Sequence, residues 1–419
     1  MKILKDNREE GGTLVVTLVT CLIIGVVLGS YLELVSSRYK ITVRSQCWNA
    51  AIPVAEQGVE EAMAHLVDDS DPAANDWALG TNAGQTVYSK QRTNADGSYF
   101  LANLYNTGTN NPFIYSTGFV PSPLQSGSYI FRTVKVTCAN APLFSFAFAA
   151  EYAIQMNGSG LAADSFNSSL TNLSTNGQYD PSKTSTNGNV ASVYGPVNFG
   201  NHTISGSLYL GPQVTTSSVG PGQVSGQIYS DFNVSFPDVT LPSTLVSPPP
   251  APVATVNGIS TYYFTVSGDY YVTSGSKPII VAPGVTVRVR VDATSFSPAN
   301  LDVQYANGIS GSMSVYQVSG SASIAASLAV ESGKAQNFYY YGLPAVTSVT
   351  AGGNSSWVGV IYAPEADLTL NGGGGNNGLI GACVTKTITM NGHYNFHFDE
   401  ALLTIGPMRP YTPASWDEI

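Results

Sequence analysis

The chain contains little charge. Only 11% of its 419 residues are charged, with 17 Lys and Arg against 27 Asp and Glu. An average globular domain carries about 25% charged residues, so a cytosolic helical enzyme is disfavoured. The net charge of −10 leaves no basic surface for neutralising phosphates. These values argue against nucleic acid as a partner.

Cysteine is also scarce, and its four residues lie far apart. No Cys-x-x-Cys pair or Cys/His run has a zinc spacing, so we predict neither a structural metal nor a cofactor. If most of the chain is exported, Cys47 and Cys138 are candidates for a disulfide. The alternative is that all four cysteines are small buried hydrophobic residues.

Known catalytic motifs are missing as well. The sequence has no Gly-x-Ser-x-Gly elbow, no His-Glu-x-x-His and no phosphate loop. Glycine and tyrosine, by contrast, are abundant, with 42 and 24 residues, and 43% of the chain is hydrophobic. This composition indicates short strands joined by turns around a sizeable core. We therefore predict a mainly β protein that is not an enzyme.

The strongest single feature is the uncharged stretch from Thr13 to Leu32. As a helix it would be about 30 Å long, enough to span a bilayer, and no clear signal-peptidase site follows it. Lys and Arg residues flank both ends, so the charge balance does not set the topology. The low-charge β-rich remainder predicts that the bulk lies outside the cytoplasm, in the periplasm or at the cell surface.

Beyond the apolar stretch the pattern stays helical. Apolar residues recur at steps of three and four from Trp48 to Leu66, with glutamates between them. One helix, bent at Pro53, is therefore predicted over 13–66. Its first part would be transmembrane, and its second part would be a stalk whose apolar stripe packs on a globular body.

A short polar leader ending in Gly11-Gly12, the hydrophobic helix and the run Ala51 to Ala62 resemble the N-terminal region of PilX-type minor pilins and other pilin-like proteins. The resemblance implies a leader over 1–12, cut by a prepilin peptidase beside Gly11, Gly12 and Thr13. It also implies that the freed helix packs with other pilin-like subunits in the inner membrane.

This sequence departs from the major-pilin pattern at two positions. Thr13 replaces an aromatic residue, and the fifth mature position is Thr17, or Val16 if the cut follows Gly11, instead of glutamate. That glutamate compensates a buried amino terminus, so its absence bears on polymerisation. A plain single-span anchor is the alternative.

Two short sequence motifs repeat in the rest of the chain. An apolar-x-apolar-Asn-Gly unit begins at Ile154, Leu368 and Ile388, and an apolar-x-Gly-x-apolar-Tyr unit begins at Ile204 and Val224. Repeats about 20 residues apart, with Asn-Gly at the corners, are typical of a right-handed parallel β-helix, or solenoid. A β-sandwich is the competing fold.

The expected organisation follows from these segments. After the helix we predict a small mixed β region over 67–143, solenoid over 144–238, a Pro-rich connector over 239–258, solenoid with a C-terminal cap over 259–406, and a tail over 407–419. The terminal run from Trp357 to Leu402 is similar to a β-helical C-terminal domain, of undefined biochemical role, found in bacterial pilin-like surface proteins.

The run from His393 to Asp399 offers the one candidate metal site. Alternation along a strand would put His393, His397 and Asp399 on one face, where they could hold a divalent metal. We favour another interpretation, in which these polar side chains cap the last coil by binding backbone amides.

Two functions are compatible with these features. The favoured one is a pilin-like, membrane-anchored surface protein, a minor pilin or envelope-assembly component, that presents a structural or adhesive β-helix and contacts surface glycans. The alternative is a membrane-tethered carbohydrate-active enzyme, a lyase or hydrolase, which needs paired carboxylates. Its candidates are Asp269, Asp292, Asp302, Glu365 and Asp367.

Overall fold

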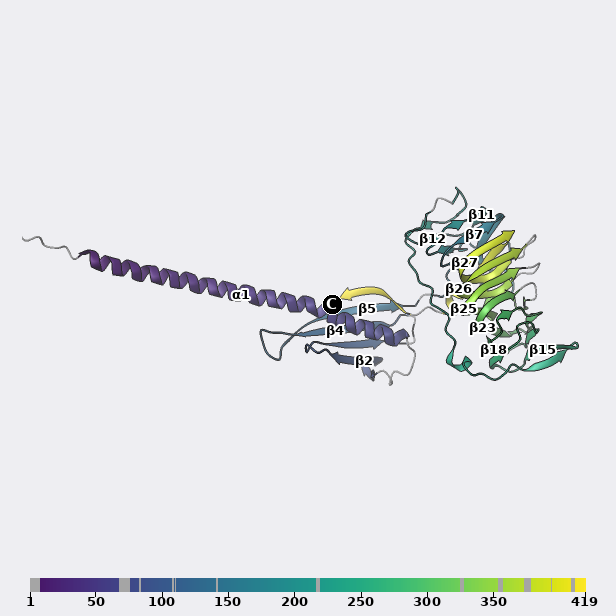
Figure 1. Ribbon diagram of the computed structural model, residues 1–419, viewed down its shortest axis with the longest axis horizontal. Helices are drawn as coiled ribbons and strands as arrows, with labels where there is room; N and C mark the ends of the chain where they lie inside the picture. Colours follow the sequence, from purple (N-terminus) through teal and green to yellow (C-terminus); the bar gives the residue numbers. More distant parts are fainter. Residues whose placement is uncertain are drawn as a thin grey trace, which may run out of the picture. The chain divides into compact units, whose positions relative to one another are not determined.

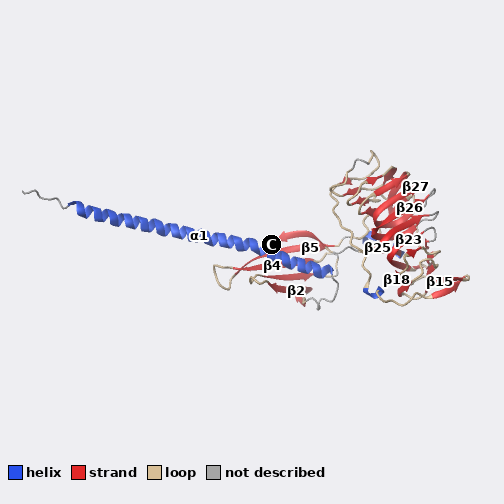
Figure 2. Ribbon diagram, in the orientation of Figure 1, coloured by secondary structure: helices blue, strands red, loops and turns tan. Residues whose placement is uncertain are grey.

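The computed structural model describes residues 8–67, 76–82, 84–107, 109, 111–140, 142–215, 219–324, 328–352, 357–372, 378–392, 394–407 and 411–419. The chain forms two compact units. Unit 1 comprises Met1–Ala141 and Arg409–Ile419, and unit 2 comprises Pro142–Met408. Unit 1 combines a long helix with a sheet, and unit 2 consists mainly of strands, which confirms a mainly β protein with a long N-terminal helix (Figure 2).

Helix α1 spans Arg8–Val67 and continues through Pro53 (Figure 1). Its N-terminal apolar window of 18 residues is not buried at all. By length and composition this helix can serve as a membrane anchor or a signal segment. The long apolar helix predicted from the sequence is confirmed.

Unit 1 adds one antiparallel sheet to this helix. Its strands are β1 (Ala78–Asn82), β2 (Gln85–Thr93), β3 (Tyr99–Tyr105), β4 (Phe113–Pro121), β5 (Tyr129–Ala139) and β29 (Thr412–Glu418), in the order β1-β2-β3-β4-β5-β29. The segment expected to be a tail is therefore largely a strand, paired antiparallel with β5. All seven residues of β29 are exposed, so the sequence has no alternation of apolar residues that would predict this strand.

The second half of α1 packs closely on the sheet. Ala51, Ala55 and Ala62 are fully buried, and the Ser116 hydroxyl donates a hydrogen bond of 2.7 Å to the carbonyl of Ala55. Small side chains allow the helix backbone to approach Gly118 of β4. This contact confirms the prediction that the apolar stripe in the second part of the helix packs on a globular body.

Unit 2 is built from mostly parallel strands, which range from two to 16 residues in length. They are β6 (Phe148–Ala150), β7 (Ile154–Asn157), β8 (Ser159–Phe166), β9 (Val190–Ser192), β10 (Val197–Asn198), β11 (Asn201–Ile204), β12 (Leu208–Leu210), β13 (Ile228–Tyr229), β14 (Val253–Val256), β15 (Ile259–Phe264), β16 (Gly268–Val272), β17 (Ile279–Val281), β18 (Thr286–Val291), β19 (Ser295–Phe296), β20 (Leu301–Val303), β21 (Tyr305–Ala306), β22 (Ile309–Ser310), β23 (Ser312–Ile324), β24 (Leu328–Val330), β25 (Phe338–Gly352), β26 (Trp357–Gly372), β27 (Gly378–Gly392) and β28 (Asn395–Asp399). The described residues of this unit also form the short helices η2 (Ser243–Leu245), η3 (Ala335–Asn337) and α2 (Leu402–Ile405).

The large sheet of unit 2 runs along β13-β12-β9-β6-β27-β26-β25-β23-β18-β16, and every neighbouring pair on this path is parallel (Figure 1). A second sheet has the order β14-β15-β17-β20-β24, in which β14 and β15 are antiparallel and the other pairs parallel. The parallel ladders do not fit the alternative β-sandwich, whose strands pair antiparallel.

Spatial order differs from chain order in this sheet. The chain enters at β6 in the middle, continues to β13 at one edge, and resumes with β16 at the other edge. It then proceeds to β27, which pairs with β6. The segment between the two halves includes the predicted Pro-rich connector, within which β14 forms a hairpin with β15.

The repeated sequence motifs lie side by side. Met390 is in register with both Leu370 and Met156, and all three side chains are buried. The asparagines that follow form an amide ladder, in which Asn157 donates to Asn391 at 3.0 Å and Asn391 donates to Asn371 at 2.9 Å. In the second motif Tyr209 is in register with Tyr229, and their rings stack with centroids 4.7 Å apart.

A column of tyrosines runs along the outward face of the large sheet. Tyr316, Tyr341 and Tyr362 occupy successive register positions of β23, β25 and β26. The segment that returns the chain to β16 packs on this face, because the Tyr362 hydroxyl donates a 2.6 Å hydrogen bond to the carbonyl of Pro237. Further along, Leu245 of the same segment is fully buried.

Candidate functional site

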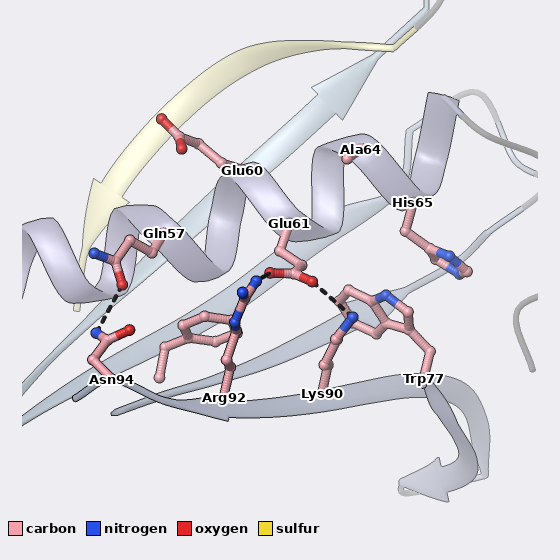
Figure 3. Close-up of a pocket in the computed structure, with 10 residues that line it drawn as sticks. Gln57, Glu60, Glu61, Ala64, His65, Trp77, Lys90, Arg92 and Asn94 are labelled. Atoms are coloured by element: carbon pink, nitrogen blue, oxygen red, sulfur yellow. Dashed lines mark hydrogen bonds and ion pairs between the residues drawn. The ribbon is translucent and has the colours of Figure 1, made fainter. Parts of the chain in front are cut away.

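A recess lies beside the end of α1 in unit 1, with a volume of about 550 Å³ (Figure 3). One wall is the last turns of α1, and the other is β2 with the residues that flank it. The lining side chains are Gln57, Glu60, Glu61, Ala64, His65, Trp77, Lys90, Arg92, Asn94 and Phe100. The volume is within the range of small-molecule sites, about 300–1,000 Å³.

The recess holds one carboxylate between two cations. Glu61 lies 2.7 Å from the Lys90 ammonium and 3.1 Å from the Arg92 guanidinium. The hydrogen bond from Lys90 is the main cause that lowers the pKa of Glu61, with Arg92 adding to it and partial burial opposing it. Glu61 thereby neutralises much of the positive charge of β2. An anionic ligand would have to compete with this carboxylate.

The floor of the recess is aromatic. The His65 and Trp77 rings stack with centroids 4.9 Å apart, and Lys90 lies 5.8 Å from the Trp77 ring centroid. Opposite them Gln57 accepts a 3.0 Å hydrogen bond from Asn94. In Figure 3 the Glu60 carboxylate points away from these groups. The recess is a structured amphipathic surface.

The pH dependence of unit 1 tests the Glu61 pairs. Because the folded protein holds the pKa of Glu61 below its ordinary value, the ionised carboxylate stabilises the fold above that ordinary value, and this stabilisation is lost as the pH falls through the lowered pKa. We expect Glu61→Gln to lower the melting temperature by about 2 °C near neutral pH and to have no effect near pH 2, as scanning calorimetry would measure. Glu60→Gln is the matched control and should change nothing. A pH-independent effect of Glu61→Gln would contradict the ion pairs.

The structure places the candidate metal ligands in separate interactions. His397 is buried, its Nδ1 lies 2.6 Å from Asp164, and its ring stacks on Tyr179 at 3.7 Å. Tyr179 in turn donates a 2.8 Å hydrogen bond to Asp164. Burial and the neighbouring Asp164 charge raise the pKa of Tyr179. These contacts make a closed polar cluster in the interior.

Asp399 binds backbone amides. Its Oδ1 accepts hydrogen bonds from the amides of Ser168 at 2.9 Å and Ala401 at 3.1 Å, and burial raises its pKa. Such contacts are what the capping interpretation expects, although β28 is not at an open edge, since it lies between β27 and β8. His393 lies outside the described residues. Among the described residues no group of three His, Cys, Asp or Glu could hold a metal ion.

The expected pairing of Cys47 with Cys138 is wrong. All four cysteines are free, and Cys47 and Cys138 are buried. The Cys47 sulfur lies 3.8 Å from the carbonyl of Pro121, at the end of β4, whereas the Cys138 sulfur lies 3.3 Å from the sulfur of Met63. Since Met63 follows Cys47 by 16 helical residues, the two thiols sit about 24 Å apart along α1. Burial raises the pKa of Cys138 to about 11.

The five candidate carboxylates are not paired with one another in the described interactions. Asp269 binds Arg288 and Asp292 binds Arg290, while Asp367 accepts a 2.6 Å hydrogen bond from Thr387. The two remaining carboxylates have acidic neighbours outside the set. They are Asp302, whose pKa is raised by burial and by Glu331, and Glu365, which helps to raise the pKa of Glu151. Three strands separate Asp269 on β16 from Glu365 on β26.

The positions of the implied leader cleavage begin the long helix. Gly11, Gly12 and Thr13 lie in the first turns of α1, and Gly12 has open space around its backbone. Residues 1–7 of the implied leader lie outside the described residues. Of these positions, Gly12 and Thr13 are exposed.

The fold and these sites define a two-unit, mainly β protein with a long exposed apolar helix. Residues 260–405 match the model of a family described as a domain of unknown function, DUF7305. This match begins in β15 and ends at α2, so it covers about a third of the chain. No curated protein matches the chain, and no solved structure matches it.

Proposed function

We propose that this protein is a pilin-like, membrane-anchored component of an envelope assembly, a minor pilin or a related subunit. Its α1 would pack with the helices of other pilin-like subunits in the inner membrane. Unit 2 would lie outside the cytoplasm as a structural or adhesive module. The observation that carries this proposal is the division of α1 into a fully exposed apolar half and a half packed on an antiparallel sheet.

Within this proposal unit 2 is a parallel β-helix. Its support is the register, because segments that follow one another in the chain return to the same sheet in parallel. Gly268 pairs with Val287, and Val287 pairs with Met313. The amide ladder joins Asn371 to Asn391, 20 residues further on, which is one coil of such a helix. In β18 the inward valines are buried, as in a solenoid wall.

Mass spectrometry of the N-terminus on protein from its own host tests the anchor. We expect the mature chain to begin at Gly12 or Thr13, because a peptidase cut beside the leader glycines releases residues 1–11 or 1–12. Gly11→Val combined with Gly12→Val should leave the leader in place. Gly25→Val is the control, since Gly25 also lies on the open helix surface.

The same strains report assembly. Deletion of the gene, or retention of the leader, should abolish pili or surface attachment. An intact leader on the mature protein, together with normal piliation and attachment after deletion, would contradict the proposal.

A further inference from the structure

Two large aromatic side chains are exposed side by side at one corner of unit 2. Tyr152 follows β6 and Tyr194 follows β9, and their exposed fractions are 45% and 58%. Their ring centroids are 5.8 Å apart. The tyrosines in the middle of the large sheet differ, since Tyr362 is only 3% exposed. We call Tyr152 and Tyr194 the exposed tyrosine pair.

The backbone fixes this pair. The amide of Tyr194 donates a 2.8 Å hydrogen bond to the carbonyl of Glu151, and the amide of Tyr152 donates a 2.8 Å hydrogen bond to the carbonyl of Lys386. Three successive segments are thereby held in register at the corner. The rings are presented by a rigid scaffold, which lowers the conformational entropy that binding would cost.

Polar groups of both signs surround the pair. The Lys386 ammonium lies 6.0 Å from the Tyr152 ring centroid. The pKa of Glu151 is raised first by burial and then by Glu365, with Lys386 opposing this and Asp238 adding to it. The Lys386 ammonium therefore offers hydrogen-bond donors beside the Tyr152 ring, and it also interacts with the Glu151 carboxylate of the neighbouring residue.

Amide side chains lie on β7, which begins two residues after Tyr152. Gln155, on the same segment as Tyr152, donates a 3.0 Å hydrogen bond to Asn157, from which the amide ladder continues to Asn391 and Asn371. These side chains orient one another and carry no charge. Parallel register repeats them at the strand spacing of about 4.8 Å.

We propose that the exposed tyrosine pair and the amide ladder at the end of β7 bind an uncharged glycan chain. Sugar C–H faces stack on exposed aromatic rings, and sugar hydroxyls exchange hydrogen bonds with amides and carboxylates. The net charge of −10 disfavours a polyphosphate or another polyanion. This inference deepens the proposed function and rests on it for the place where the glycan is met, outside the cytoplasm.

Binding of neutral hexasaccharides by the purified full chain tests the site. The probes are cellohexaose, chitohexaose and maltohexaose, measured by isothermal titration calorimetry in lauryldimethylamine oxide, a detergent without a sugar headgroup. We expect at least one of them to bind, and Tyr152→Ala combined with Tyr194→Ala to weaken that binding by about tenfold or more. The corresponding double Phe variant keeps both rings and should bind within about twofold of the wild type.

Tyr305→Ala is the matched control, because Tyr305 is an equally exposed tyrosine (46%) on the β21–β22 hairpin of the same unit. It should bind as the wild type does. Failure of all three hexasaccharides to bind, or unchanged binding by the double Ala variant, would overturn the inference. The N-terminal mass experiment is independent of this outcome, so either proposal can fail alone.

Discussion

Gly118→Ala is expected to destabilise unit 1 by about 3 kcal/mol, which corresponds to a melting temperature roughly 10 °C lower. A Cβ at this position of β4 would lie less than 3.0 Å from backbone atoms of Ala51, Val54 and Ala55. Backbone atoms cannot rotate away, so α1 must move off the sheet. The buried alanines of the helix would then lose their contacts. Differential scanning calorimetry of the full chain in detergent measures the change.

Gly80→Ala is the control for this prediction. Gly80 lies in β1 of the same sheet, and its added Cβ would meet only the Val87 side chain at 3.8 Å, which is ordinary contact. This variant should change the stability of unit 1 by less than about 0.5 kcal/mol. Equal destabilisation by both substitutions would contradict the close approach of helix and sheet.

Gly381→Ala is expected to prevent unit 2 from reaching its native packing. Gly381 of β27 and Gly359 of β26 are in register, with φ of +137° and +143°. An alanine here pays backbone strain of about 1–3 kcal/mol. Its Cβ would also lie less than 3.0 Å from the carbonyl of Gly359 and adds overpacking of about 1–3 kcal/mol. Near-UV circular dichroism and trypsin resistance of the full chain measure the loss.

Gly222→Ala separates these two causes. Its φ of +78° also disfavours a side chain, but open space surrounds its position. It should cost about 1 kcal/mol and leave unit 2 folded. Hydrogen exchange in β4 gives an internal check, because unit 1 should keep its protection in Gly381→Ala. Native trypsin resistance of Gly381→Ala would show that the two glycines do not need their conformation.

Local features of the fold could be predicted from the sequence. Length and composition define the apolar half of α1, and three- and four-residue steps define its packed half. The Asn-Gly motifs could be aligned because identical residues fall into register, as Asn371, Asn391 and Asn157 do. In each case the signal is a pattern of neighbouring residues that can be recognised without knowing which strands pair.

Features that depend on distant pairing could not be predicted. Strand β29 has no buried residue, and the return of β27 to β6 joins Cys383 to Phe148 across most of unit 2. The disulfide hypothesis failed because the sequence does not show that Cys138 packs against Met63, about four helical turns beyond Cys47 on α1. The ion pairs of Glu61 and the exposed tyrosine pair likewise depend on contacts between segments that no sequence pattern connects.

The placement of β29 beside β5 also constrains how the protein can be made. Thr412 bonds to the carbonyl of Ala139, 273 residues earlier, and the amide of Leu143 bonds to the carbonyl of Pro407. Unit 2 is thus an insertion between two neighbouring strands of unit 1. During synthesis the sheet that packs on α1 stays incomplete until the strand after the insertion has emerged. Such high contact order slows folding and leaves an open sheet edge in the nascent chain.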